Sequence, residues 1–178
     1  MQLYNKLSAK ERAELIEKAG KDRLTLSFYQ YAKIENPQEF RDQLFIIWDK
    51  LDVLGRIYIA SEGINGQLSL PADRFNEFKT HIDTIHFLKG IRLNVAVEQD
   101  NMSFLKLKVK VRDKIVADGL NDDTFDVTNK GVHVGAEKFN ELIEDEDTVL
   151  VDMRNHYESE IGHFKNAVTP DVDTFRES

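Results

Sequence analysis

The chain has 178 residues and a formal net charge of −8, from 24 Lys and Arg against 32 Asp and Glu. It contains no cysteine, which excludes disulfides, zinc ribbons and a thiol nucleophile within these residues. No apolar run approaches the roughly 20 residues that a membrane helix needs. We therefore expect a soluble protein of the cytoplasm that has no membrane partner.

The charge is distributed unevenly along the chain. Residues 1–112 carry 18 basic and 15 acidic side chains, a net of +3, whereas residues 113–178 carry 6 basic and 17 acidic ones, a net of −11. Such a split indicates two units with different partners. We expect a first domain over residues 1–112, a polar linker over 113–130 and a second domain over 131–178.

Helix and strand patterns alternate through the first domain. A capping box formed by Ser8 and Glu11 predicts a first helix that ends at Gly20, and Asn36 before Pro37 predicts the start of a second. Alternating apolar and polar residues predict strands over 24–32, 55–60, 64–70, 91–98 and 104–112, with a third helix from residue 71. The resulting β-α-β-β-α-β order with one extra strand is that of an α+β, ferredoxin-like fold, the split βαβ arrangement that acylphosphatases share.

The two faces of this predicted sheet differ in chemistry, because side chains along a strand point alternately to opposite faces. Apolar side chains should face the helices: Leu26, Phe28, Ile57, Ile59, Leu68, Leu107 and Val109, with Ile91, Leu93, Val95 and Val97 of the strand over 91–98. The opposite face should collect cations and tyrosines, namely Lys106, Lys108, Lys110, Arg112, Arg92, Tyr29, Tyr31 and Tyr58. Sheets of this topology bind single-stranded RNA by stacking bases on aromatic rings while cations hold the phosphates. A solvated face, or one covered by the second domain, fits the same alternation.

The second domain begins with an amphipathic helix over 136–143, which an apolar strand over 148–152 follows. Apolar strands that alternate with helices imply a parallel sheet that is buried on both faces. Residues 131–178 number only 48, against roughly 100 for a complete domain of this class. We therefore expect the chain to end inside an α/β domain, and this incomplete half to be held by packing on the first domain or by self-association with another copy of the chain.

Three stretches of the sequence resemble a known family: GRIYIASEGING at 55–66, VRDKIVADG at 111–119 and VDMRNHYESEIGHF at 151–164. In this order they resemble the bacterial rhodanese-domain tRNA uridine hydroxylases, over nearly the whole chain. The resemblance implies a tRNA-modifying oxidoreductase that forms 5-hydroxyuridine at the wobble position in an oxygen-dependent way. It implies tRNA, and not DNA, as the partner, and molecular oxygen as co-substrate, with no cofactor evident.

The last stretch also resembles rhodanese domains in general, which implies scaffold positions at Asp152, Arg154, Glu158, Gly162 and His163. We expect Asp152 and Arg154 to form a structural ion pair at the turn into the next helix, and His163 to be a packed, hydrogen-bonded histidine. The resemblance also implies a reactive cysteine in a later loop, to which nothing in this chain corresponds. We therefore assign no catalytic residue, and we expect the N-terminal part of a longer rhodanese-like enzyme that is inactive alone.

Other interpretations stay open on the sequence. The five histidines include no pair at i,i+4 spacing and no HExxH motif, so no metal site is predicted. An RNA- or protein-binding module without its own catalysis fits the same residues, as does part of a persulfide sulfurtransferase of the rhodanese type. A cysteine-containing loop past residue 178 would favour either enzyme over the binding module.

Overall fold

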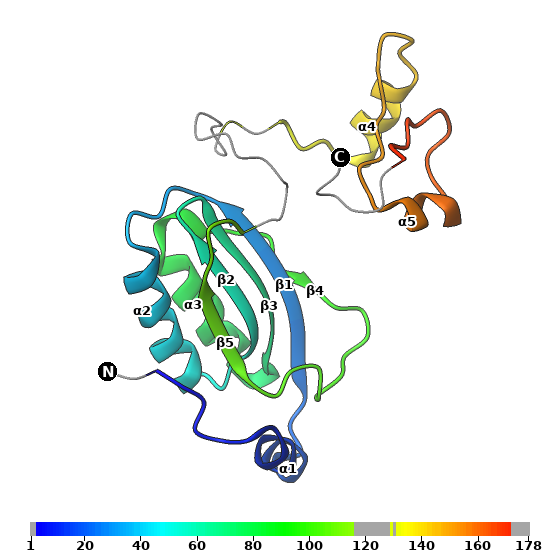
Figure 1. Ribbon diagram of the computed structural model, residues 1–178. Helices are drawn as coiled ribbons and strands as arrows, with labels where there is room; N and C mark the ends of the chain where they lie inside the picture. The colour runs from blue at the N-terminus through cyan, green and yellow to red at the C-terminus, as the bar shows by residue number, and fades with distance from the viewer. Residues whose placement is uncertain (1–2, 116–128, 130, 172–178) are drawn as a thin grey trace. The chain divides into compact units, whose positions relative to one another are not determined.

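The computed structural model describes residues 3–115, 129 and 131–171, which fall into two units that divide after Ile115. Of the predicted linker over 113–130, residues 116–128 and 130 lie outside the described residues. The first unit contains a β-sheet with helices, and the second contains two short helices and their connections (Figure 1).

Five strands form the sheet of the first unit, in the order β4-β1-β3-β2-β5 (Figure 1). The strands are β1 (Arg23–Tyr31), β2 (Leu54–Ala60), β3 (Gly63–Pro71), β4 (Asn94–Val95) and β5 (Leu107–Val111). β5 runs parallel to β2, and the other neighbours are antiparallel. The helices α2 (Pro37–Lys50) and α3 (Phe75–Thr84) connect the strands, and the short 3-10 helices η1 (Ala72–Arg74) and η2 (His86–Leu88) flank α3. The predicted β-α-β-β-α-β order with one extra strand is therefore confirmed.

The helix ends form where the local sequence predicts them. In α1 (Ala9–Ala19), the side chain of Ser8 accepts the N–H of Glu11 at 3.2 Å, and the Glu11 carboxylate accepts the N–H of Ser8 at 2.8 Å. Gly20 ends α1 at a φ of 59°, where a residue without Cβ has no clash. Asn36 begins α2 by accepting the N–H of Glu39 at 3.1 Å. These bonds satisfy backbone donors that the first turn of a helix leaves unpaired.

The core lies between one face of the sheet and the helices α2 and α3. Trp48 of α2 is fully buried, and its ring centroid lies 6.3 Å from that of Phe28 on β1 and 5.2 Å from that of Phe78 on α3. Its Nε1–H donates to Nδ1 of His81 at 3.1 Å, so the buried indole keeps a hydrogen bond. The apolar strand residues that share this core include those predicted, namely Leu26, Phe28, Ile57, Ile59, Leu68, Leu107 and Val109.

The strand predicted over residues 91–98 is wrong in length, and two of its side chains are more exposed than predicted. Only Asn94 and Val95 pair with β1. Val95 pairs with Leu26 and so lies on the core side of the sheet, as predicted, but at the sheet edge it is 45% exposed. Val97 was also expected to face the core, but it lies outside the strand and is fully exposed. Ile91 and Leu93 do pack against the core, from outside the strand.

Side-chain amides of the following loop explain why β4 is so short. Gln99 accepts the N–H of Thr25 at 2.6 Å, and Asn101 accepts the N–H of Arg23 at 2.9 Å. These amides occupy the edge of β1 that a longer strand would need for its own backbone hydrogen bonds. The chain therefore leaves the sheet after Ala96, whose N–H donates to the carbonyl of Thr25 at 2.9 Å.

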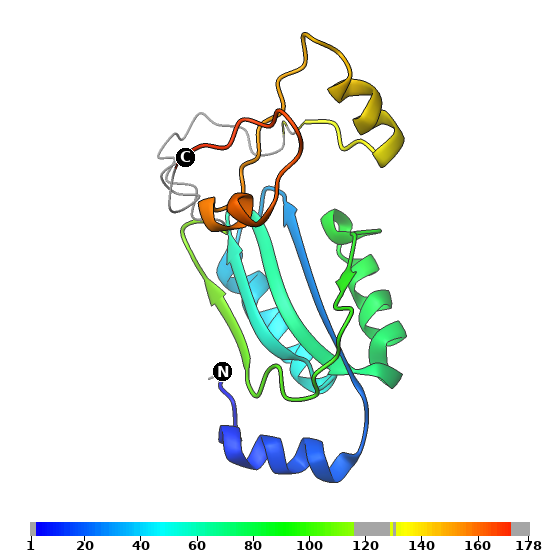
Figure 2. The ribbon, with the colours of Figure 1, turned by 90° about the vertical axis from the view of Figure 1, so that its right-hand side faces the viewer.

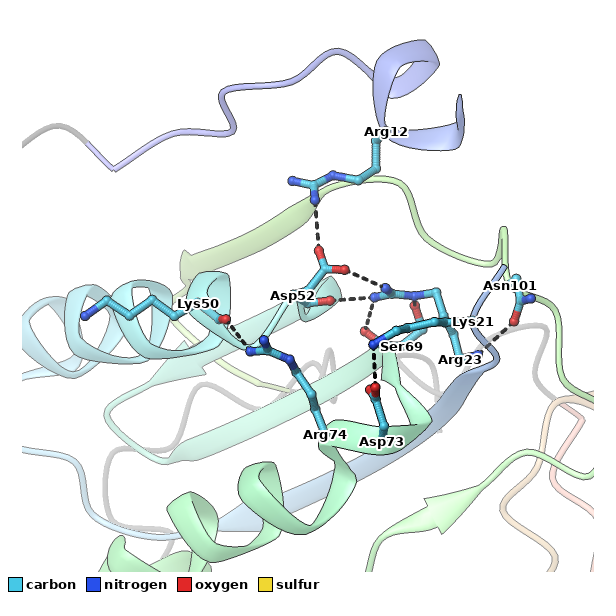
Figure 3. A network of polar contacts seen from close by, with 9 residues as sticks. All are labelled: Arg12, Lys21, Arg23, Lys50, Asp52, Ser69, Asp73, Arg74 and Asn101. Atoms are coloured by element: carbon cyan, nitrogen blue, oxygen red, sulfur yellow. Dashed lines mark hydrogen bonds and ion pairs between the residues drawn. The ribbon is translucent and has the colours of Figure 1, made fainter. Parts of the chain in front are cut away.

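A buried arginine ties α1 to the end of the sheet (Figure 3). Arg23 is 3% exposed, and its guanidinium donates to the Asp52 carboxylate at 3.0 Å, to the Asp52 carbonyl at 2.6 Å and to the Ser69 carbonyl at 3.1 Å. Burial lowers the pKa of Arg23, an effect that the Asp52 carboxylate partly offsets. The other Asp52 oxygen pairs with Arg12 of α1 at 2.8 Å. This network holds α1 at the end of the sheet where β1 begins (Figure 2).

The second unit forms the predicted helix over 136–143, α4 (Ala136–Ile143), and then α5 (His156–Ile161). The strand predicted over 148–152 reduces to one parallel bridge between Val151 and Val168, which lie on either side of α5 in the chain. Within residues 131–171 the side chain of Ser159 is buried, whereas many apolar side chains are exposed, among them Ile161 at 89%. The described residues of this unit therefore do not form a sheet that is buried on both faces.

Candidate nucleic-acid interface

We call the face of the sheet opposite α2 and α3 the open face. Residues that pair on neighbouring strands share a face, so the register defines its side chains row by row. The first row is Ser27, Gln67, Arg56 and Lys108, and the second is Tyr29, Asn65, Tyr58 and Lys110. All of these side chains are at least partly exposed. The two rows thus combine three cations with two tyrosines and contain no acidic residue.

The open face is less accessible at its two ends than in the middle. At the end near α1, Ser69 and Leu54 form the next row and are 0% and 1% exposed. At the other end, Nδ2 of Asn65 donates to the carbonyl of Ile115 at 3.3 Å, and Ile115 is buried. The accessible part of the open face is therefore a band of two rows, with its basic side on β2 and β5.

The cations of this band have no carboxylate partner in the described part of the chain. Arg56, Lys108 and Lys110 are exposed, and the ion pairs between described residues do not include them. Lys106 and Arg112 continue the alternation just outside β5 and are exposed as well. Uncompensated cations in a row, on a chain of net charge −8, give a local field that attracts polyanions.

The tyrosines of the open face differ in how accessible their rings are. Tyr29 is 56% exposed, and its ring meets that of Tyr31 edge-on at 6.3 Å between centroids. The guanidinium of Arg112 lies 5.5 Å from the ring centroid of Tyr58, a cation–π contact. Of these three rings, that of Tyr29 is therefore the one best placed to stack on a base.

The predicted face is confirmed for the residues that pairing places on it, namely Tyr29, Tyr31, Tyr58, Lys108 and Lys110. Lys106 and Arg112 follow the same alternation, whereas Arg92 lies before β4, where no pairing assigns it to a face. Arg56 was not predicted, although it stands two residues before Tyr58 in the same alternating strand, which is the signal that identifies it. Binding of RNA by these residues stays a prediction.

In the second unit, Asp152 and Arg154 form the predicted ion pair. Nε and Nη2 of Arg154 donate to the two carboxylate oxygens of Asp152 at 2.9 and 2.6 Å, and Nη2 also donates to the carbonyl of Gly162 at 2.7 Å. These hydrogen bonds from Arg154 lower the pKa of Asp152 to about 2, and Asp152 raises the pKa of Arg154. The pair thus joins the two ends of the segment that contains α5.

Glu158 and His163 have local hydrogen bonds at the ends of α5. Oε1 of Glu158 accepts Nδ2 of Asn155 at 2.9 Å, at the residue that precedes the helix. Nδ1 of His163 lies 2.9 Å from the carbonyl oxygen of Ser159. The prediction that His163 is hydrogen-bonded is confirmed, whereas the prediction that it is packed is wrong, because the residue is exposed.

Among the described residues, no three His, Asp or Glu side chains lie together in a group that could hold a metal ion. No helix in residues 3–115 or 131–171 is long and apolar enough to cross a membrane.

Comparison with known proteins identifies relatives along nearly the whole chain. Residues 23–115 match the UPF0176 acylphosphatase like domain. The chain is 54% identical over 175 residues to a tRNA uridine(34) hydroxylase of Leptospira interrogans. The aligned region covers 98% of this chain and 47% of that protein. It is 48% identical over 176 residues to the proteins of the same name from Hamiltonella defensa and Yersinia enterocolitica, over 98% of this chain and 50% of each. The chain thus spans about half the length of the curated relatives it matches.

Proposed function

Because the chain belongs to the family of the UPF0176 acylphosphatase like domain, we propose that it acts in tRNA modification, as the substrate-binding part of an enzyme that hydroxylates uridine at the wobble position of tRNA. One observation carries the proposal: the identity of 48–54%, across 98% of the chain, to proteins named tRNA uridine(34) hydroxylase. We propose the cytoplasm as its location, since tRNA is the substrate, and molecular oxygen as co-substrate.

The open face is the surface that we assign to tRNA. Lys108, Lys110 and Arg56 lie in adjacent rows without carboxylate partners among the described residues, an arrangement that suits contacts to successive phosphates. The exposed ring of Tyr29 lies in the same row as Lys110, across the sheet. An unpaired base of a tRNA loop can stack on such a ring while its backbone follows the cations.

The second unit fits the first part of a rhodanese-like domain. The parallel bridge between Val151 and Val168 encloses α5, as a strand-helix-strand connection does. The pair of Asp152 and Arg154 closes the turn before α5 onto Gly162. The 178 residues contain no cysteine, so a thiolate of the kind that rhodanese chemistry uses cannot come from them. We therefore assign substrate binding, and no catalytic residue, to this chain.

Nucleoside mass spectrometry of tRNA from a strain that lacks the encoding gene tests the proposal. We expect 5-hydroxyuridine and nucleosides made from it to disappear, and thiolated nucleosides to stay at their normal level. Re-expression of the gene should restore them. Loss of thiolated nucleosides with 5-hydroxyuridine unchanged would instead support a sulfurtransferase, and no change in either would contradict a modifying enzyme.

A further inference from the structure

A hollow of about 260 Å³ lies beside the start of β5, at the edge of the open face, and we call it the β5 hollow. Its basic side consists of Arg56, Lys106 and Lys108. Its apolar side comes from the segment before β5, with Met102, Phe104 and Leu105. Arg56 and Lys108 also form the basic end of the first row of the open face. The accessible band of the open face therefore leads directly into the β5 hollow.

The apolar side of the β5 hollow does not belong to the core. Met102, Phe104 and Leu105 are each partly exposed, and within residues 3–115 they are not among the side chains packed on the core cluster. Apolar surface left in water forgoes the free energy that its burial would release. A ring held in this position, next to cations that have no carboxylate partner in the described chain, matches a ligand with one flat apolar group and one anionic group.

The arrangement of the cations favours a polymer as that ligand. Lys106, Lys108 and Lys110 recur at every second residue, which in a strand is a spacing of about 6.6 Å. Such a series suits a chain that has a charge on every unit. An acidic peptide satisfies the cations but offers no flat ring to the apolar side at each unit, and an RNA duplex keeps its bases stacked inside.

We propose that the β5 hollow binds one unstacked nucleotide of single-stranded RNA, with its base against Phe104 and its phosphate on Arg56 and Lys108. This rests on the proposed function, in which tRNA meets the open face. The volume of about 260 Å³ lies below the roughly 300–1,000 Å³ of drug-sized sites, so the hollow takes a single base. The remaining cations of β5 then hold the neighbouring phosphates along the open face.

Fluorescence anisotropy with short labelled RNAs tests this subsite on the whole chain. The probes are single-stranded octauridine, a ribose-phosphate octamer without bases, an RNA duplex of eight pairs and octaglutamate. Phe104→Leu should lower the affinity for octauridine about tenfold and leave the affinity for the abasic octamer unchanged. Phe104→Tyr should bind octauridine as tightly as the wild type does. Arg56→Ala should weaken both single strands and reduce the slope of log K against log salt by about 0.7. Lys79→Ala, which removes an exposed cation from α3, is the matched control and should change neither.

Three results would overturn the subsite. The first is equal loss of octauridine and abasic binding in Phe104→Leu, or no loss in either; the second is an Arg56→Ala variant that behaves like Lys79→Ala. The third is octaglutamate or the duplex binding as tightly as octauridine, which would indicate a protein surface or simple charge attraction. If one of these three results is found while tRNA from the deletion strain lacks 5-hydroxyuridine, only the proposed subsite is wrong. If that tRNA keeps 5-hydroxyuridine, the proposed function is wrong, whatever octauridine does.

Discussion

Replacement of Asp52 by Asn should destabilise the first unit, because it removes the charge that faces a buried guanidinium. Asn keeps the size of the side chain and tolerates the left-handed backbone of this position, whose φ is 55°. Loss of one partner from a fully buried ion pair costs about 3–5 kcal/mol. The Asp52 side chain is 41% exposed, so water screens part of the interaction, and exposed pairs are worth only about 0–1 kcal/mol. Arg23 also keeps its bonds to two carbonyls. We therefore expect a loss of about 1–3 kcal/mol.

Urea unfolding followed by tryptophan fluorescence measures this loss. Trp48 is the only tryptophan of the chain and is fully buried in the core of the first unit, so its emission reports the unfolding of that unit. The matched control is Asp73→Asn, which breaks an ion pair with Lys21 whose two side chains are 55% and 60% exposed. That variant should lose less than about 0.5 kcal/mol. If Asp52→Asn loses no more than Asp73→Asn, the buried network does not hold α1 in place and the reasoning is refuted.

Three further outcomes are expected. Burial lowers the pKa of His81, whose neutral Nδ1 accepts the indole N–H of Trp48. The contribution of His81 to the free energy of unfolding should therefore be full above about pH 6.5 and fall as the pH drops toward the lower folded-state pKa. This pH dependence should vanish in a His81→Gln variant. Gly55→Ala should destabilise the first unit by at least about 1 kcal/mol in the same urea assay, since the added Cβ would lie 2.3 Å from the carbonyl oxygen of Gln67. A variant as stable as the wild type would contradict the close approach of β2 and β3. In hydrogen-exchange mass spectrometry, residues 131–171 should exchange much faster than the sheet of the first unit, because their apolar side chains are largely exposed; equal protection would contradict that difference.

Much of the first unit follows from signals that act over a few residues. The capping bonds of Ser8 and Asn36 form within one helical turn, so the sequence locates these helix starts without knowledge of the fold. The chemistry of the open face is also predictable, since strict alternation leaves each of β1, β2 and β5 only one way to bury its apolar residues. The pairing register then brings Tyr58 and Lys110 together as that alternation requires.

The parts that escaped prediction depend on contacts between distant residues. Arg23 reads as an exposed strand end, and only the fold brings Asp52, 29 residues later, to its guanidinium. The prediction of a strand over 91–98 is wrong because the side chain of Gln99 accepts the N–H of Thr25, which is 74 residues earlier in the sequence. No local pattern encodes such bonds. The β5 hollow likewise forms only where Arg56 on β2 and Phe104 before β5 lie close together. The pairing of β2 with β5, which joins residues far apart in the sequence, brings them there.

The affinity of the chain for tRNA as a function of salt tests the central claim, that the basic side of the open face binds tRNA. The variant changes Lys106, Lys108 and Lys110 together to Glu. The matched control changes three exposed lysines away from that face, Lys50, Lys79 and Lys89, to Glu, so that both carry the same net charge. We predict that the β5 variant binds tRNA far more weakly, with a salt slope shallower by about 0.7–0.9 for each phosphate that the protein no longer neutralises, while the control keeps the wild-type slope. Equal affinity and slope in the two variants would contradict the account.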